Sequence, residues 1–217
     1  MTTVSPTATG RSAARPSLTR HTIAGARMLL AFTLLVGIAY PIAVTGLSQV
    51  LFGWRANGSL VTADGSPTAD RDEAVGSALI GQSFDGDEWF HPRPSVAGDG
   101  YDTLASGGSN LGPESTDLVA QIEQRRLAVA ALEGVDVSQV PPDAVTASAS
   151  GLDPHISPAY ARLQIDRVAQ ARGLPVAHVS ALVAEHSSGR TLGILGDPWV
   201  DVLALNIALE SVSQAAQ

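Results

Sequence analysis

The chain has 217 residues, all thirteen of its basic residues are arginine, and it contains no cysteine. That length accommodates one domain of ordinary size and a membrane anchor. The lack of cysteine excludes disulfides, thiolate metal sites and a cysteine nucleophile. Residues 1–27 carry a net charge of +4 and residues 28–217 a net charge of −12. An acidic domain without a basic stripe is a poor candidate for nucleic-acid binding.

An uncharged apolar stretch, residues 28–52, is predicted to be a transmembrane helix, and thirteen of its residues are Leu, Ile, Phe or Val. As a helix it spans about 37 Å, enough to cross a hydrocarbon layer of about 30 Å. The four arginines before it favour a cytoplasmic N-terminus and an exported main domain. Residues 1–24 have a disordered composition and form the predicted cytoplasmic tail. The alternative is a cleaved signal peptide, for which the apolar stretch is unusually long.

Two features of the apolar stretch concern its packing. Pro41 lies mid-span and is expected to kink the helix. Ala39, Ala43 and Gly46 recur at helical spacing and form a stripe of small residues. Such stripes allow another membrane helix to approach closely, so these residues are predicted to pack against a partner helix. The alternative is that the stripe faces lipid.

After the apolar stretch, residues 55–75 are predicted to be a linker with a short strand at 60–61, and residues 76–212 to form one exported soluble domain. Ser157 suits a helix N-cap, Pro158 a first helical position and Gly173 a helix end, which predicts a helix over 158–172. Other helices are expected at 114–133, at 175–186 and after Asp197 and Pro198, with a strand at 191–196. Helices and strands do not alternate strictly, so the predicted class is α+β.

Histidines suggest catalytic or metal chemistry, but their spacing gives it little support. His178 and His186 are eight residues apart, not the four of a helical zinc pair. Asp153 and His155 supply two possible ligands and would need others. No Gly-x-Ser-x-Gly elbow occurs. We therefore predict no catalytic residue and no metal site, and the alternative is a membrane-anchored exported hydrolase that uses His155 and Asp153.

The loop before the first predicted soluble helix is rich in glycine and serine. It contains Ser106, Gly107, Gly108, Ser109 and Asn110, whose backbone N–H groups could surround an anion. It is no phosphate-binding Walker motif, because the chain has no lysine. The alternatives are a tight structural loop, in which the glycines adopt positive φ, and a contact with another protein.

Several blocks, in order along the chain, give a resemblance to a known family. They read Phe-His-x-Arg-Pro-Ser at 90–95, Ser-Gly-Gly-Ser-Asn-Leu-Gly-Pro at 106–113, Val-Thr-Ala-Ser-Ala-Ser-Gly-Leu-Asp-Pro-His-Ile-Ser-Pro at 145–158, Arg-Val-Ala-x-Ala-Arg at 167–172, Leu-Gly-x-Leu-Gly at 192–196 and Val-Leu-x-Leu-Asn at 202–206. The chain resembles the C subunit of the Kdp potassium-transporting ATPase over roughly residues 27–210.

The resemblance implies a non-catalytic accessory subunit of an ATP-driven, high-affinity potassium uptake complex in the plasma membrane. Implied partners are a channel-like subunit that translocates potassium, a P-type ATPase subunit, a small membrane subunit and the bilayer. It also implies a catalytic chaperone that raises the ATPase subunit's affinity for ATP. The chain would then have no cofactor of its own, and ATP would enter through a ternary complex with the ATPase subunit.

The predicted topology fits direct ATP contact poorly, because ATP is cytoplasmic and an exported domain at −12 would repel it. Support of assembly on the channel side is therefore the physically easier role. The residues expected to contact a subunit or ligand are those from Ser106 to Asn110 together with Asp153 and His155. Besides the hydrolase, a second alternative to the transport subunit is a binding protein with a signal peptide. Copurification with larger membrane partners would distinguish a transport subunit from both alternatives.

Overall fold

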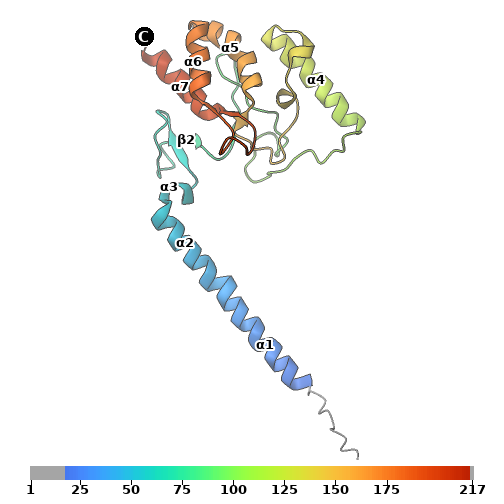
Figure 1. The fold of residues 1–217 in the computed structure, drawn as a ribbon, viewed down its shortest axis with the longest axis vertical. Coiled ribbons are helices and arrows are strands. Elements are labelled where there is room, and N and C mark those ends of the chain that lie inside the picture. The colour runs from blue at the N-terminus through green and yellow to red at the C-terminus, as the bar shows by residue number, and fades with distance from the viewer. Residues whose placement is uncertain (1–17, 216–217) are drawn as a thin grey trace, which may run out of the picture. The chain divides into compact units, whose positions relative to one another are not determined.

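A computed structural model describes residues 18–215. The chain divides after Gly53 into two compact units. The first unit is a single helical run, made of α1 (Leu18–Leu34), the π-helical segment η1 (Leu35–Ala39) and α2 (Tyr40–Leu51) (Figure 1). The run has 34 residues and no buried side chains, and an 18-residue stretch of it has a mean hydropathy of 2.1. By length and composition it can cross a membrane, which supports a membrane anchor.

The helical run begins earlier than the sequence predicted. Residues 18–24 are helical, whereas the prediction placed them in the disordered tail; residues 1–17 of that tail lie outside the described residues. The segment 18–24 contains no proline or glycine, and extending an existing helix gains one hydrogen bond for each residue fixed. Thr22 supports this first turn by donating its hydroxyl to Leu18 O at 3.0 Å.

Pro41 changes the hydrogen bonding of the helix at the place where the sequence predicted a kink. It lies at the start of α2, directly after the π-helical segment. Tyr40 N–H bonds to Leu35 O, five residues back, instead of the usual four. Proline cannot donate a hydrogen bond, and its ring clashes with the carbonyl four residues before it. A wider turn at this point is a common way for a helix to relieve such a conflict.

The second unit contains α3 from Trp54 onward, four longer helices and two small antiparallel sheets. The helices are α4 (Thr116–Glu133), α5 (Pro158–Arg172), α6 (Val176–Glu185) and α7 (Val202–Ala215), with α3 at Gly53–Ala56 and short 3-10 turns η2 (Val137–Gln139) and η3 (Pro142–Ala144). One sheet pairs β1 (Leu60–Thr62) with β2 (Ala74–Ser77). The other has the order β3-β5-β4, from β3 (His155–Ile156), β5 (Trp199–Asp201) and β4 (Ser187–Ser188). The predicted α+β class is confirmed.

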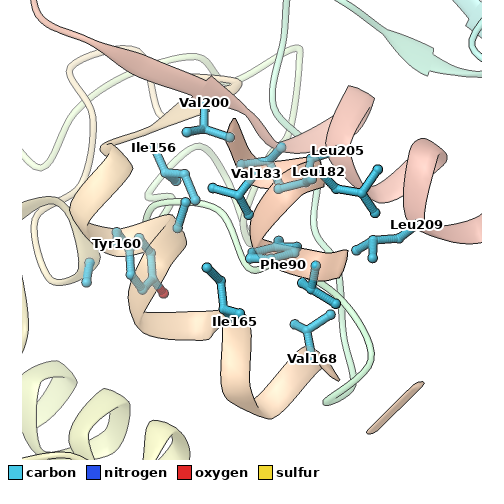
Figure 2. Packing of buried hydrophobic residues seen from close by; sticks show 14 of the residues in the cluster. Phe90, Ile156, Tyr160, Ile165, Val168, Leu182, Val183, Val200, Leu205 and Leu209 are labelled. Carbon is cyan, nitrogen blue, oxygen red and sulfur yellow. The ribbon is translucent and has the colours of Figure 1, made fainter. Parts of the chain in front are cut away.

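The hydrophobic core of the second unit lies among α5, α6, α7 and the segment around Phe90 (Figure 2). Phe90 is fully buried, and the sticks in Figure 2 show Val183, Leu205 and Ile165 around it. Helix α5 packs against α6, and α6 against α7 (Figure 1). Phe90, from the irregular segment 84–91, therefore lies in the core between helices that come from the other end of the chain, while residues 85–88 of that segment are exposed.

Two buried amide side chains satisfy the backbone of this irregular segment. Asn206 on α7 accepts from Phe90 N at 2.9 Å and donates to Phe90 O at 3.0 Å. Gln164 on α5 accepts from His91 N at 2.7 Å and donates to His91 O at 3.1 Å. Buried backbone groups without partners are costly, and each amide supplies one donor and one acceptor as a neighbouring strand would.

The predicted elements of the second unit differ in how well they match the structure. Helix α5 has the predicted bounds, with Ser157 as N-cap and Gly173 in the left-handed conformation at its end. The predicted strand at 191–196 is wrong: that segment is a turn with an isolated bridge between Thr191 and Leu195. The strand is instead 199–201, where the sequence predicted the start of the last helix. Residues 60–62 of the predicted linker form β1 and pair with β2.

Candidate functional site

The loop 145–153 is the meeting point of three other segments. Gly81 N donates to Leu152 O at 2.8 Å, and the Ser95 hydroxyl donates to Gly151 O at 2.6 Å. From a third segment, the Ser106 hydroxyl donates to Ser150 O at 2.9 Å. The blocks at 90–95, 106–113 and 145–158, which are far apart in sequence, therefore lie together in space.

Arg93 and Asp153 form the charged centre of this meeting point. Arg93 Nη1 lies 3.0 Å from Asp153 Oδ2, and Arg93 Nη2 donates to Thr146 O at 3.3 Å. The Tyr101 hydroxyl donates to Arg93 O. Burial, reinforced by the negative charge of Asp153, raises the pKa of Tyr101 above its usual value, so this hydroxyl keeps its proton. The group thus joins the 93–101 segment firmly to the 146–153 loop.

His155 extends from this centre toward β5. Its backbone N donates to Asp153 Oδ1 at 3.0 Å, and its ring Nδ1 lies 3.7 Å from the same oxygen. The ring packs on the Trp199 ring with centroids 3.9 Å apart and planes inclined by 41°. Asp153 and His155 are therefore in contact with each other, and their predicted role in contacting a subunit or ligand stays a prediction. The contact between the His155 and Trp199 rings also holds β3 beside β5.

Beside His155 lies an open cleft of about 550 Å³. It is lined by Arg93, Pro141, Pro142, Asp143, Asp153, His155, Ile156, Ser157, Ala159, Asp197, Pro198 and Trp199. The charged groups of this lining are one arginine, already paired, and three aspartates. A polyphosphate would meet net repulsion in such a cleft, so these residues do not fit the phosphates of ATP.

Ser157 is the serine nearest to the Asp153 and His155 pair in sequence, and its bonds are those of a helix cap. Its hydroxyl donates to Asp143 Oδ1 at 2.8 Å and accepts from Tyr160 N at 3.0 Å. Its backbone N donates to Asp143 Oδ2 at 2.7 Å. Within residues 18–215, no serine or threonine hydroxyl forms a hydrogen bond with a histidine ring. A nucleophile activated by a neighbouring base is therefore not assembled around His155 in this structure.

The glycine- and serine-rich loop packs against loop 145–153, and its glycines do not have the positive φ that the sequence suggested. Among residues 106–112, only Asn110 has a positive φ, 54°, and it is exposed. Gly107 N donates to Ser150 O at 2.9 Å, and a Cβ on Gly108 would lie 3.2 Å from Ala149 O. Gly108 therefore allows the close approach of the Ala149 backbone. The expectation that the glycines of this loop adopt positive φ is wrong, and Asn110 is the residue that adopts that conformation.

The remaining predicted residues of this loop contribute no ligand-binding geometry. The Ser109 hydroxyl accepts a long hydrogen bond, 3.5 Å, from Leu111 N. Helix α4 begins after Ser115, whose hydroxyl accepts from Leu118 N, so the loop does not run directly into a helix N-terminus. Among the described residues, no three His, Asp or Glu side chains are grouped in a way that could hold a metal ion.

In the first unit, Ala39 and Ala43 line a shallow apolar groove together with Leu35, Val36 and Tyr40. Gly46 is not among the lining residues, and a Cβ added there would meet nothing within 4 Å. The groove lies where the π-helical segment meets α2. Two of the three predicted packing residues therefore share a surface, and whether a partner helix or lipid occupies it stays a prediction.

A buried ion pair that the sequence analysis missed joins three segments of the second unit. Arg167 Nε lies 3.0 Å from Glu133 Oε1, and the side chains of these two residues are 7% and 1% exposed. Arg167 also donates to Asp87 O at 2.6 Å and Trp89 O at 3.0 Å. Burial raises the pKa of Glu133, although the Arg167 guanidinium opposes this. The pair joins α4, α5 and the segment before Phe90; no local sequence signal marks contacts across such distances.

Comparison with known proteins identifies the family. The family model of KdpC, the K⁺-transporting ATPase c chain, matches residues 22–211. The potassium-transporting ATPase KdpC subunit of Kineococcus radiotolerans is 54% identical over 202 residues, 93% of this chain and 99% of that protein. The KdpC subunit of Rhodospirillum rubrum is 54% identical over 183 residues, 84% of this chain and 91% of that protein.

A third relative, the KdpC subunit of Mycobacterium tuberculosis, is 48% identical over 192 residues, 88% of this chain and 98% of that protein. The similarity thus includes the apolar helix, the meeting point around loop 145–153 and the core helices. The chain belongs to the KdpC family and is an accessory subunit of a potassium-transporting ATPase complex.

Proposed function

We propose that this subunit is non-catalytic and supports assembly of the complex with its second unit on the outer side of the membrane. The observation that carries the proposal is the bonding of Asp153 and His155. Asp153 is paired with Arg93 at 3.0 Å, and His155 packs on Trp199. Asp153 and His155, the residues most suggestive of an enzyme, thereby connect different segments of the unit. Such connections make a surface rigid, as a contact with a partner requires. The hydrolase alternative has no activated nucleophile to support it.

The proposed orientation rests on charge. Residues 1–27 carry a net charge of +4 and the rest of the chain −12, and arginines near a membrane helix remain in the cytoplasm. The absence of cysteine makes a clean test possible. A single cysteine introduced as Leu104→Cys, at a 96% exposed side chain, should react with a membrane-impermeant maleimide in intact spheroplasts. Reaction only in inverted membrane vesicles would reverse the orientation.

We further propose that the subunit raises the ATP affinity of the ATPase subunit by coupling across the membrane. A second unit outside the cytoplasm cannot touch ATP, and the cleft beside His155 carries three aspartates. The subunit would then raise ATP affinity by stabilising the conformation of the ATPase subunit that binds ATP more tightly. Such coupling between sites typically changes an affinity by about 5- to 150-fold. Complexes purified without this subunit should show a KM for ATP raised by about fivefold or more.

Potassium-stimulated ATP hydrolysis by the purified complex tests the non-catalytic role. His155→Ala should change the rate by no more than a few-fold, as should the control His178→Ala at an exposed position on α6. Loss of a general base costs on the order of a hundredfold or more. A loss of that size for His155→Ala alone, in a fully assembled complex, would contradict the proposal and restore the hydrolase hypothesis.

A further inference from the structure

The turn at residues 190–197, called here the apolar turn, presents aliphatic side chains to solvent. Leu192, Ile194 and Leu195 are 84%, 76% and 57% exposed. A connection between two strands is ordinarily made of polar turn residues, because exposed aliphatic groups contribute nothing to folding. Three such side chains within four consecutive positions form an exposed apolar patch, and patches of this kind mark interaction sites.

The apolar turn is held in one shape. Thr191 N donates to Leu195 O and Leu195 N to Thr191 O, both at 2.9 Å, while Gly193 N donates to Arg190 O at 2.9 Å. Arg190 Nη2 lies 3.3 Å from Asp197 Oδ1 across its base. A fixed shape lowers the entropy lost on binding, so the turn is pre-organised for a complementary recess.

Its backbone conformation strengthens this interpretation. Leu192 has a φ of 55°, in the left-handed region that favours glycine or asparagine. The same conformation at Gly193, with a φ of 77°, carries no such penalty. A leucine at a strained and exposed position stabilises neither the backbone nor the core. Strain of this kind is found where a side chain is needed for function.

We propose that the apolar turn docks into an apolar recess on another subunit of the potassium-transporting ATPase complex, an inference that rests on the assembly role above. Membership of that complex requires a contact with other subunits. A lipid surface fits less well: segments that bind membranes carry excess Lys and Arg, whereas Arg190 is paired with Asp197 and the chain after residue 27 is at −12.

The contact area of three side chains is small beside that of a complete protein interface. It is sufficient here because the membrane helix already holds the subunit in the complex. A second contact made by a tethered partner acts at a high effective concentration and needs little affinity of its own. The turn therefore acts as an anchoring point that fixes the second unit on its partner.

The test replaces Leu192 and Ile194 together by asparagine in the full-length chain. Asparagine tolerates a positive φ better than leucine does. The Tm of the isolated full-length chain in detergent should therefore be unchanged or slightly higher. The other subunits should be recovered with the tagged chain in smaller amounts as the detergent concentration rises. The loss should correspond to association about tenfold weaker, which is typical for loss of an anchoring side chain. Leu104→Asn, at a side chain that is 96% exposed, is the matched control and should leave recovery unchanged.

Unchanged recovery with the double variant, or equal losses with the double variant and Leu104→Asn, would overturn the proposal. Lost binding to anionic lipid vesicles with full subunit recovery would assign the turn to the bilayer, and lost self-association would assign it to a second copy; both overturn it. If the double variant unfolds, Ile194→Asn alone makes the same test without altering the strained residue. Recovery of the subunits does not depend on ATP turnover, so failure of the docking proposal would not contradict the non-catalytic role. Conversely, a catalytic role of His155 would leave the recovery of the subunits unaffected.

Discussion

Replacing Asn206 by leucine tests how the core holds the segment that leads to the cleft. Asn206 is 1% exposed, and its amide makes two hydrogen bonds to the backbone of Phe90, at 2.9 and 3.0 Å. Leucine has the same number and branching of side-chain heavy atoms, so the variant removes both bonds while leaving the space filled. Phe90 N and O would then remain buried without partners.

The expected cost follows from those two groups. Leaving a buried backbone donor or acceptor unsatisfied costs about 1–3 kcal/mol. Two such groups, partly offset by the burial of an additional apolar side chain, give an expected loss of about 2–4 kcal/mol. For a domain of about 160 residues this corresponds to a fall in Tm of roughly 4–16 °C.

Thermal unfolding of the full-length protein in detergent, followed by tryptophan fluorescence, measures this loss. Trp89 precedes Phe90, and Arg172 Cζ lies over its ring, 4.3 Å from the ring centroid. Its fluorescence therefore reports on this segment. Ser211→Ala is the control on the same helix, because that exposed hydroxyl bonds only to Ala208 O in the preceding turn. A loss below about 0.5 kcal/mol for Asn206→Leu, the range of ordinary surface changes, would refute the reasoning.

Three further predictions follow from other parts of the molecule. Ala39→Leu with Ala43→Leu should weaken copurification of partner subunits without preventing membrane insertion, because bulk is added in the apolar groove; unchanged copurification would mean that the groove faces lipid. Gly151→Ala should lower the Tm by several degrees, because φ is 68° and a Cβ would lie 2.8 Å from that of Ala97; an unchanged Tm would contradict this. Burial lowers the pKa of His91 below 6.5, so the unfolded chain binds a proton more readily and stability falls as pH drops below that value; His91→Gln should reduce the difference in Tm between about pH 7.5 and pH 5.5, and an equal difference would disprove this origin.

Local signals explain what could be predicted of the fold from sequence. The capping residues Ser157 and Gly173 are sufficient to define α5, because each acts within one turn of the helix end. The strand 199–201 was missed, because it exists only by pairing with residues 155–156 on one side and 187–188 on the other. Such pairing has no signature within the strand itself. In a three-residue segment, alternation of apolar residues is too short to identify.

Polar residues account for most of what was missed in the core and the site. Gln164 and Asn206 have polar amide side chains, which a sequence pattern does not assign to a hydrophobic core, yet they are 0% and 1% exposed. Their burial follows from the irregular backbone of Phe90, which needs donors and acceptors that no regular element supplies. The ion pair of Arg93 with Asp153 joins residues sixty positions apart, and only the assembled fold brings them together.

The chain from Phe90 to Ser95 connects these observations. It begins in the core, where Asn206 holds Phe90, and ends at the loop, where the Ser95 hydroxyl donates to Gly151 O at 2.6 Å. Between them, Arg93 binds Asp153 beside the cleft. Four of the six residues of this segment, Phe90, His91, Arg93 and Ser95, are held by a side chain or backbone group from elsewhere in the unit. An enzyme would need a base placed against a nucleophile at the end of such a scaffold, whereas a contact surface needs only that the scaffold be rigid, because rigidity lowers the entropy lost on binding. The bonding of this segment therefore provides the rigidity that the proposed contact role requires.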